Sequence, residues 1–444
     1  MSGLAAPSGV DGWQDGAVAR ILVVQHDYPP AELGGYGVMC AQVCHWLADR
    51  GHQLLVLTTR PAAAGAAIGD DKQARASITV RRVLVSYWDE ATQECVYPSF
   101  TDALAIERAN HAHLRAALAE HQPEVVSFWH MGALSLGLIT DTAQLGLPIV
   151  FVVGDDWLCY GGWADGWLRR FADDPDPKRA ELVARQTGLP TRLPDLGELG
   201  VFCFVSDLLR RRAEQVGGWR LRRWLVAHPG VATAQFPRPY GDTDELALAR
   251  EWSWRLLWIG RVTAAKGAAT AIQALASLPE RAGLRVVGPV QPDTRQDLEA
   301  LAAAHGVAGR VSFAIVPHQR VRACYQLADV TLFTSALANE GFGLVQLEAM
   351  ASGCPLVTSG AGGAAEFCTD ADNCLLVPPG DPAALAAAVR RLAADPPLRV
   401  RLVAGGLRTA ATLTLDRQAS LIEQALLSAT ARRRQAVPPE RRGR

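Results

Sequence analysis

Two glutamates near residue 340 have the types and spacing needed to hold a sugar-like ligand. Glu340 is followed at once by Gly341, Phe342 and Gly343, and Glu348 lies eight residues further on, in an apolar run typical of a helix. Eight residues on one helix rotate a side chain by roughly 80°, so both carboxylates can reach one ligand only if Glu340 lies in the preceding loop. The glycines allow the backbone to approach a ligand and leave N–H groups free at the helix start. With the helix dipole, these donors favour a phosphate, so we expect a polyhydroxylated, phosphate-bearing ligand.

Two basic residues could bind the phosphates of that ligand. Arg261 and Lys266 lie five residues apart, directly after the buried-strand run 255–260 and before a helix. Two fixed cations can hold a diphosphate and neutralise the charge that develops when it departs. The alternative is a surface pair without a ligand.

Polar residues also follow two buried runs in the first half of the chain. His130 comes after the run 124–129, and Asp155 and Asp156 come after the run 148–153. Ligands bind at the carboxyl ends of strands in open α/β sheets, which favours a functional His130 over a structural histidine. Either aspartate could orient an acceptor hydroxyl or act as a base, or could cap the next helix.

A glycine-containing loop lies near the start of the chain. Gly34 and Gly35 follow the strand run 20–25 and precede a helix that ends near Gly51. The spacing is not Gly-x-Gly-x-x-Gly, and no acidic ribose ligand follows the second strand, so a dinucleotide site is not indicated. A tight turn without a ligand is the alternative.

Strands and helices alternate along most of the chain. This order predicts an α/β protein with two doubly wound parallel-sheet, Rossmann-like domains. The strands expected from apolar runs are 20–25, 53–58, 78–85, 124–129, 148–153, 201–205, 255–260, 284–287, 311–313, 329–334 and 354–358. Residues 60–77 are interpreted as a loose loop, and helices are expected over 101–120, from Ser206 as N-cap to about 215, and over 319–327.

Composition narrows the class of protein. The 444 residues suit two domains, and a net charge of −1 argues against a general nucleic-acid binder. No signal peptide and no apolar run of about 18 residues is visible, which favours a cytoplasmic protein. The nine cysteines include no Cys-x-x-Cys pair, and Cys40 and Cys44 lie on an apolar helical stripe, so we expect reduced structural thiols. Asp174-Pro175-Asp176 is interpreted as a turn, and metal dependence is not indicated.

Two segments have open interpretations. Residues 157–199 are interpreted as an insertion in which Trp157, Trp163 and Trp167 either stack on an acceptor or pack against the domain. The basic, aromatic segment Arg210–Trp224 could contact the inner membrane face peripherally or an anionic acceptor, or could be a solvated helix face.

The motif at residues 340–357 resembles a known family. Glu-Gly-Phe-Gly…Glu-Ala-Met-Ala-x-Gly-x-Pro-Leu-Val is similar to the signature of the family-four retaining glycosyltransferases (glycosyl transferases group 1), which have the GT-B fold of two domains facing a central cleft. The resemblance covers roughly residues 20–428. Composition indicates a disordered leader at 1–19, a linker at 236–254 and a disordered basic tail at 431–444. With these limits, the resemblance implies an acceptor-side domain at 20–235, a donor domain at 255–410 and a helix at 411–430 crossing back to the first domain.

The resemblance also implies a reaction and its residues. The protein would transfer a sugar from a nucleotide-diphosphosugar, most commonly a UDP-sugar, to a sugar, lipid or small-molecule hydroxyl, without a required cofactor and by a same-face mechanism. Glu348 would bind the ribose, and Glu340 with the N–H groups of Gly341, Phe342, Gly343 and Leu344 would hold the sugar. Other contacts that the resemblance implies are the diphosphate with Arg261, Lys266, Gly34 and Gly35, the base with Val316, and the transferred sugar with His130. Asp155, Asp156 and Trp157 are expected on the acceptor side from their own residue types.

Two other activities fit the same motifs. One is a pseudo-glycosyltransferase that couples cyclitols without forming a glycosidic bond. The other is a catalytically silent protein that only binds sugar nucleotides. The nucleotide base, the sugar, the acceptor and the oligomeric state are left open by the sequence.

Overall fold

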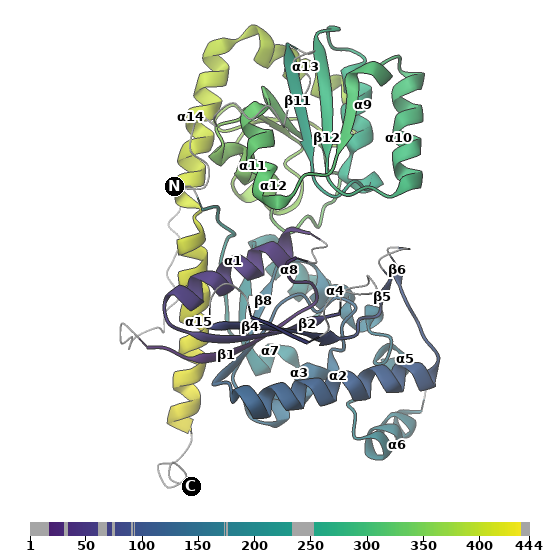
Figure 1. The fold of residues 1–444 in the computed structure, drawn as a ribbon, viewed down its shortest axis with the longest axis vertical. Coiled ribbons are helices and arrows are strands. Elements are labelled where there is room, and N and C mark those ends of the chain that lie inside the picture. Colours follow the sequence, from purple (N-terminus) through teal and green to yellow (C-terminus); the bar gives the residue numbers. More distant parts are fainter. Residues whose placement is uncertain are drawn as a thin grey trace. The chain divides into compact units, whose positions relative to one another are not determined.

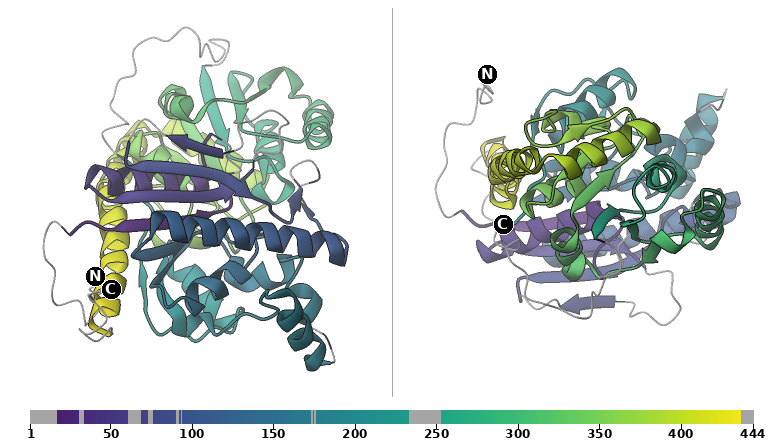
Figure 2. Two further views of the ribbon diagram at one scale, coloured as in Figure 1. Left: turned by 60° about the horizontal axis from the view of Figure 1, so that its bottom comes forward. Right: turned by 90° about the horizontal axis from the view of Figure 1, so that it is seen from above.

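Two compact units make up the protein: Met1–Ala227 together with Gln418–Arg444, and His228–Arg417. The computed structural model describes residues 17–30, 34–60, 69–72, 76–89, 92, 94–172, 174, 176–232 and 253–436 (Figures 1 and 2). The predicted leader up to residue 16 and most of the predicted linker lie outside these residues. Ala19 differs from the prediction of a disordered leader: it is buried, and its amide donates to His52 Nδ1 at 3.1 Å.

The first unit is built on a mostly parallel sheet. Among the described residues its strand order is β10-β9-β8-β7-β1-β2-β4-β3, and only β3 runs antiparallel to its neighbour. β1 lies in the middle of the sheet, paired with both β2 and β7, because its apolar run is buried on both faces. The strands are β1 (Arg20–Gln25), β2 (Gln53–Thr59), β3 (Gly69–Lys72), β4 (Ile78–Leu84), β7 (Val125–Phe128), β8 (Ile149–Val153), β9 (Gly200–Phe204) and β10 (Trp224–Val226), with a separate hairpin of β5 (Trp88–Asp89) and β6 (Glu94–Cys95).

Helices cover both faces of this sheet. α1 and α2 lie on opposite faces, as expected for a doubly wound unit (Figure 1). Cys40, Val43, Cys44 and Leu47 form the buried stripe of α1, and none of the nine cysteines, all of which lie in the described part of the chain, forms a disulfide. The helices are α1 (Gly35–Asp49), α2 (Phe100–His121), α3 (Gly137–Gln144), α4 (Trp157–Ala164), α5 (Arg169–Ala172), α6 (Pro177–Thr187), α7 (Leu196–Leu199) and α8 (Asp207–Gln215).

The second unit has a fully parallel sheet in its described part. The strand order is β13-β12-β11-β14-β15-β16, again with the first strand of the unit in the interior of the sheet. The strands are β11 (Trp254–Ile259), β12 (Ala282–Val287), β13 (Val311–Ala314), β14 (Val330–Phe333), β15 (Leu356–Thr358) and β16 (Leu375–Leu376). The helices are α9 (Ala268–Leu275), α10 (Pro292–Ala304), α11 (His318–Leu327), α12 (Leu344–Ala351), α13 (Pro382–Ala394) and α14 (Pro396–Thr412), with short 3₁₀ turns η3 (Ala264–Lys266), η4 (Ala308–Arg310) and η5 (Gly362–Glu366).

The main core of the second unit lies on one face of its sheet. Alternate residues of β11 and β12, such as Leu256, Trp258 and Leu284, pack with apolar residues of α9, α13 and α14. The other face carries α11 and α12, which also hold residues of the candidate site.

The last helix, α15 (Leu415–Ala436), belongs to the first unit from Gln418 onward. Glu423 accepts hydrogen bonds from Arg50 Nε at 2.7 Å and lies 2.9 Å from His52 Nε2. These contacts join the helix to the turn after α1. The helix runs six residues into the segment predicted as a disordered tail, so that prediction was wrong for residues 431–436.

The sequence-predicted strands are confirmed, with boundary shifts of one or two residues. The interpretation of residues 60–77 as a loop was wrong for β3, which pairs with β4 through residues 69–72. Ser206 caps α8 as expected, because its hydroxyl accepts a hydrogen bond from the Leu209 amide at 3.3 Å. The described part of residues 157–199 contains four helices, and Asp176 caps the third of them, α6.

Candidate active site

The loop after β11 carries the two predicted phosphate-binding residues. Arg261 is exposed and has no hydrogen bond or ion pair with any described residue. Lys266 is held by the backbone around it: Gly267 adopts φ +78°, and a Cβ there would lie 2.3 Å from the Thr334 carbonyl oxygen. Thr334 in turn donates its hydroxyl to the Gly267 carbonyl at 2.7 Å. The lysine-bearing turn is therefore fixed against the end of β14.

Glu340 lies in the loop after β14 and pairs with Lys266. Lys266 Nζ donates to Glu340 Oε2, and the two side chains are 23% and 15% exposed. The backbone of this loop is also held by the segment around Gly362, because the Gly363 amide donates a hydrogen bond to the Glu340 carbonyl at 2.8 Å. The two segments are so close that a Cβ at Gly362 would lie 2.4 Å from the same carbonyl oxygen. Gly362 and Gly363 thus allow their backbone to pack directly against the backbone of Glu340.

Helix α12 begins directly after this loop. Gly343 is its N-cap with φ +104° and makes no side-chain cap, so the Leu344 end of the helix has no capping side chain to accept from its first amides. Gln346, in the first turn, is fully buried, and neither its amide oxygen nor its amide nitrogen has a partner among the described residues. Buried polar groups are normally satisfied, so these atoms indicate that a polar ligand or water completes this place. Sequence reasoning missed Gln346.

Glu348 is one turn further along α12 and is held by a second helix. The Tyr325 hydroxyl, on α11, donates to Glu348 Oε2 at 2.8 Å, and Tyr325 is fully buried. Burial raises the pKa of Tyr325 well above its usual value, and the Glu348 carboxylate raises it further, so the phenol stays neutral and donates. Tyr325 was also missed, because an apolar helix position gives no signal for a tyrosine that orients a carboxylate.

These residues lie at one edge of the second sheet. Arg261 follows β11, Glu340 follows β14, and Val316, which is partly buried, follows β13. All three strands are parallel, so their carboxyl ends meet at the same edge, where ligands bind in this class of sheet. The structure brings the Lys266 amine directly to the Glu340 carboxylate and places Arg261 and Val316 on neighbouring loops.

A second group of polar residues surrounds His130 in the first unit. His130 follows β7, and its neighbours Asp27 and Asp155 follow β1 and β8. His130 Nδ1 lies 3.6 Å from Asp27 Oδ1, and Nε2 lies 3.4 Å from Asp155 Oδ2. The Tyr160 hydroxyl donates to Asp155 at 2.5 Å. Asp27 was missed, although it follows a strand end by the same rule that indicated His130.

The two carboxylates set the charge of His130. Burial alone lowers the pKa of His130, but the charges and hydrogen bonds of Asp155 and Asp27 outweigh it and raise the pKa to about 10. The neighbouring His26 is buried as well, and burial together with the His130 charge lowers its pKa to about 4. At neutral pH, His130 is therefore an imidazolium that can donate, while His26 is neutral.

The same side chains could be considered metal ligands. Donor atoms of His26, Asp27 and His130 all lie within 4.8 Å of one another. However, protonated His130 has no free lone pair, and it competes with a cation for the Asp27 carboxylate. The electrostatics favour a hydrogen-bond donor over a metal centre.

The adjacent aspartates have different partners. Asp155 faces His130 and Tyr160. Asp156 instead forms an ion pair with Arg212, whose Nε and Nη2 both donate to the carboxylate, and Arg212 Nη2 lies 2.6 Å from Asp156 Oδ2. Asp156 makes no side-chain cap to α4. Trp157 is 1% exposed and packs against Phe151, so its ring presents no face to an acceptor. Of the three predicted acceptor-side residues, only Asp155 lies in the His130 group.

The glycine loop of the first unit leads into α1. Gly34 and Gly35 are exposed at the helix start, with no acidic residue in the first turn. Gly37 is the glycine that sterics require, because a Cβ there would lie 2.9 Å from Asp27 Oδ2. Tyr36 stacks on His130 with ring centroids 5.2 Å apart.

Tyr36 also explains the glycine that follows β8. A Cβ at Gly154 would lie 2.8 Å from the Tyr36 ring, so only glycine leaves room for it. The Tyr36 hydroxyl donates to the Val152 carbonyl beside it. The ring thus fills the space next to His130 that a side chain at residue 154 would otherwise take.

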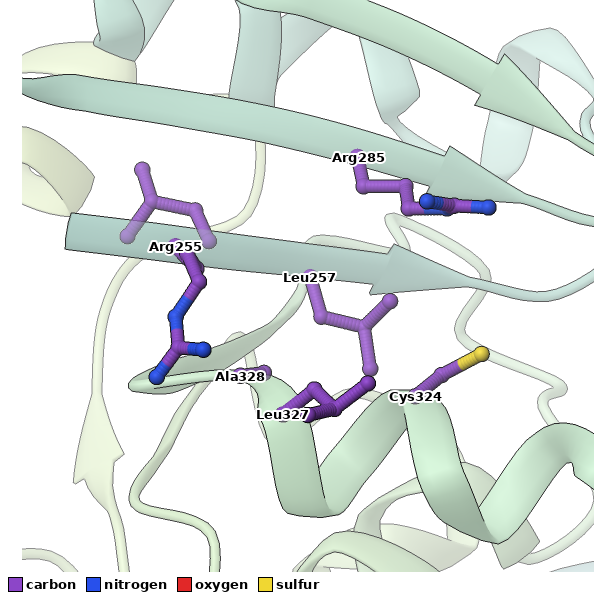
Figure 3. Close-up of a pocket in the computed structure, with 7 residues that line it drawn as sticks. Arg255, Leu257, Arg285, Cys324, Leu327 and Ala328 are labelled. Carbon is purple, nitrogen blue, oxygen red and sulfur yellow. The ribbon is translucent and has the colours of Figure 1, made fainter. Parts of the chain in front are cut away.

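One small cavity lies elsewhere in the second unit. It lies between β11 and α11, with Arg255 and Leu257 on the strand side and Cys324 and Leu327 on the helix side (Figure 3). The remaining lining residues are Leu256, Arg285 and Ala328.

Comparison with protein families gives two matches. The family model "Glycosyl transferases group 1" matches residues 247–408, which contain Arg261, Lys266, Glu340 and Glu348. The model "Glycosyl transferase 4-like domain" matches residues 34–184, which contain His130 and Asp155. Together the two models match more than half of the chain.

The chain belongs to the group 1 glycosyltransferase family.

Curated members of this family include several similar proteins. A D-inositol 3-phosphate glycosyltransferase of Xylanimonas cellulosilytica is 36% identical over 52% of this chain and 56% of its own length. The same-named protein of Thermomonospora curvata is 35% identical over 59% of this chain and 65% of its own length. The matched segment thus covers less than two-thirds of these relatives. The glycogen synthase of Mycobacterium tuberculosis is 28% identical over 85% of this chain and 86% of its own length.

Solved structures confirm the GT-B fold of a group 1 glycosyltransferase. The sucrose-phosphate synthase of Thermosynechococcus elongatus superposes with a TM-score of 0.72 at 20% identity, covering 93% of this chain and 99% of that one. HepE of Anabaena, solved in complex with UDP and glucose, gives a TM-score of 0.67 at 18% identity, covering 92% and 100%. At these identities the likeness concerns the fold alone.

Four of the six arginines in the segment Arg210–Trp224 form ion pairs with carboxylates of their own unit. Arg210 pairs with Asp207 and Glu214, Arg212 with Asp156, and Arg222 with Glu198. Paired arginines offer little attraction to anionic lipid, so the solvated-face interpretation is favoured over membrane contact. Across the described residues, no helix combines the length and the apolar character needed to cross a membrane.

Proposed function

We propose that the protein is a retaining glycosyltransferase that moves a sugar from a nucleotide-diphosphosugar to a hydroxyl acceptor. The observation that carries the proposal is the Lys266–Glu340 ion pair at the uncapped start of α12, with Glu348 eight residues further on. One ligand can then contact all three side chains. Lys266 would bind its phosphate, Glu340 would accept hydrogen bonds from the sugar hydroxyls, and Glu348 would accept them from the ribose. Gln346 supplies an unsatisfied buried amide at the same place.

The donor would be held as follows. Arg261 and Lys266 bind the diphosphate, and Lys266 exchanges part of its interaction with Glu340 for the phosphate. Glu340 accepts hydrogen bonds from the sugar hydroxyls, and the backbone amides of residues 341–344 donate hydrogen bonds to the sugar oxygens. Glu348, oriented by Tyr325, accepts hydrogen bonds from the ribose hydroxyls. Val316 contacts the base. UDP is the proposed nucleotide, and its support is that the structural relative HepE was solved with UDP and with UDP-glucose.

The proposed transfer takes place on one face of the sugar. The bond between the anomeric carbon and the β-phosphate oxygen breaks, and the acceptor oxygen bonds to that carbon from the same side. The acceptor proton passes to the departing phosphate oxygen. Arg261 and Lys266 stabilise the charge of the leaving group, a role that a metal ion has in other transferases, so the proposed reaction is metal-independent.

His130 completes the proposed mechanism. As an imidazolium between Asp27 and Asp155, it donates a hydrogen bond to the transferred sugar. It is a poor general base, because its proton is lost only near pH 10. The acceptor is proposed to carry hydroxyls in the manner of inositol phosphates or glucans, the compounds named for its relatives.

Thermal unfolding with added nucleotides tests the donor class. Ligands that bind only the native protein raise its stability, by about 2.7 kcal/mol at 100 times Kd. We expect UDP to raise the unfolding temperature and GDP, ADP and dTDP to have smaller effects. A protein that none of the four stabilises would contradict the proposal.

Product stereochemistry tests the mechanism. With the sugar nucleotide that the protein accepts, NMR of the new linkage should show the anomeric configuration of the donor. An inverted product would overturn the same-face mechanism while leaving the transferase activity standing.

A further inference from the structure

Exposed aromatic side chains gather at one place on the first unit. Trp163 is 57% exposed, and Val96, Tyr97 and Phe100 are each 42–44% exposed. They come from the loop between β6 and α2, from the start of α2 and from α4. Tyr97 and Trp163 lie together with Arg169 of α5. With Val96 and Phe100, which flank Tyr97 in the sequence, they form what we call the aromatic patch. Isolated exposed apolar residues are common, but contiguous ones indicate a binding surface.

The patch is an ordered arrangement of rings around one cation. The Tyr97 and Trp163 rings meet edge to face, with centroids 5.7 Å apart. The Arg169 guanidinium lies 4.1 Å from the Tyr97 centroid and 5.0 Å from the Trp163 centroid. The loop is anchored beneath, because the Phe100 ring packs on buried Trp167 at 5.4 Å. The rings are therefore held in place before any ligand arrives.

Among the residues that the structure describes, no carboxylate lies within ion-pair distance of Arg169. A second arginine–aromatic pair, Arg210 over Trp224 at 4.4 Å, provides the contrast, since Arg210 pairs with Asp207 and Glu214. The aromatic patch thus offers a positive charge where the comparable surface pair does not.

The patch adjoins the His130 group along α4. Tyr160, which donates to Asp155 and lies 3.5 Å from His130 Nε2, is three residues before Trp163 on this helix. Side chains three residues apart on a helix are neighbours on its surface. A molecule lying across Tyr160 and Trp163 would therefore extend from the His130 group to Arg169.

We propose that the aromatic patch binds the acceptor substrate, and that this acceptor is a sugar or cyclitol that carries a phosphate or carboxylate. This inference rests on the proposed transferase function. The aromatic faces of Trp163 and Tyr97 pack against the C–H face of the ring, and the Arg169 guanidinium pairs with the anionic group. The hydroxyl to be glycosylated then points toward His130 and Asp155.

Other occupants fit the patch less well. Anionic membranes attract clusters of several basic residues, and the patch has one. Stable protein interfaces bury roughly 1,200–2,000 Å², far more than four exposed side chains supply. A small anionic molecule matches both the size and the single charge.

Direct binding measurements test the proposal without requiring transfer. Titration calorimetry would compare inositol 3-phosphate with myo-inositol, and glucose 6-phosphate with glucose. We expect each phosphorylated compound to bind the wild-type protein about tenfold or more tightly than its neutral partner, because charged hydrogen bonds contribute roughly 1.5–3 kcal/mol. R169Q should remove this preference, and W163A should weaken binding of both members of a pair.

The second arginine–aromatic pair supplies matched controls. R210Q and W224A change the same residue types on the same unit and should leave both affinities unchanged. Equal binding of charged and neutral compounds, no binding of any of them, or an unchanged preference in R169Q would each overturn the proposal. A change in molecular mass of W163A in light scattering would instead identify the patch as a protein interface and overturn it as well.

Nucleotide binding separates this inference from the proposed function. UDP should stabilise R169Q and W163A as much as the wild-type protein, because both residues lie outside the donor-binding residues. Loss of acceptor preference with intact UDP binding supports the patch. If UDP stabilises none of the proteins, the donor proposal fails, whereas the calorimetric comparison still decides whether the patch binds anionic sugars.

Discussion

At the residue scale, the chemistry of the first unit depends on the charge of one histidine. His130 lies between Asp27 and Asp155, with Tyr36 stacked on its ring and Tyr160 bound to Asp155. The carboxylates overcome burial and keep the imidazole protonated across the physiological range. A protonated histidine can donate to a sugar oxygen but cannot deprotonate an acceptor.

Replacing Asp155 with Asn should lower the pKa of His130. The pKa of His130, about 10 in the wild-type protein, should fall by about 1–2 pH units. The reason is that the Asp155 charge is the largest of the interactions that raise this pKa. The imidazolium is therefore lost at lower pH, and the alkaline limb of the pH–rate profile moves down with it. NMR titration of the His130 ring measures the shift directly. Asp156→Asn is the control, since Asp156 pairs with Arg212; the same inflection in wild type and Asp155→Asn would contradict the assignment.

The site residues divide according to the signals that a sequence can carry. Lys266, Glu340 and Glu348 are charged residues at strand ends and helix starts, and spacing alone indicated them. Tyr325 and Gln346 act through buried partners, which no local pattern reveals. The functional role of each remains a proposal, but the Lys266–Glu340 contact and the His130–Asp155 contact are features of the structure.

At the element scale, long apolar runs predicted the sheet well and short elements poorly. β1 was predicted with its observed bounds, because a strand buried on both faces is continuously apolar. β3 lies in a polar, alanine-rich segment and forms only by pairing with β4, so its own residues gave no signal. The sequence did not indicate which tryptophans of the insertion are buried, because their burial depends on tertiary packing. In the structure Trp157 and Trp167 are buried and Trp163 is exposed.

A buried polar network connects α2 to α3 and should make stability depend on pH. His111 Nδ1 lies 2.8 Å from Asp141 Oδ2, and Nε2 lies 3.3 Å from Glu107 Oε2. Burial lowers the pKa of His111, but its two carboxylate partners raise it to about 9, and the partnership lowers the pKa of Asp141 despite burial. The histidine contribution is thus complete below pH 6.5 and is lost as pH rises to about 9, whereas the Asp141 contribution is lost in acid.

His111→Gln should therefore destabilise the first unit most at pH 5–6.5. Breaking a buried pair costs about 3–5 kcal/mol, and the difference from wild type should shrink as pH approaches 9. Thermal unfolding at several pH values measures this difference. His113→Gln, on the same helix but partly exposed, should have little effect. A His111→Gln difference that stays constant from pH 6 to 9 would contradict the proposed ionisation.

At the scale of the whole molecule, the alternation of strands and helices was sufficient to predict two Rossmann-like units. The repeated order leaves few topologies, and the family match and the structural relatives confirm the GT-B fold. The last helix was less predictable, because α15 begins in one unit and continues into the other, and its apolar pattern does not mark that change. Domain boundaries and substrate identity depend on contacts far apart in the sequence, which a single chain does not display.

The central claim is that the second unit binds a nucleotide diphosphate through Lys266 and Glu348. Calorimetric titration of UDP into wild type, Lys266→Ala and Glu348→Ala tests it most directly. Each variant loses a charge-assisted hydrogen bond, so affinity should fall about 10- to 100-fold. Lys178→Ala and Glu299→Ala, which remove the same charges from exposed helix positions, should bind like wild type. Wild-type affinity in both Lys266→Ala and Glu348→Ala would contradict the proposed donor site.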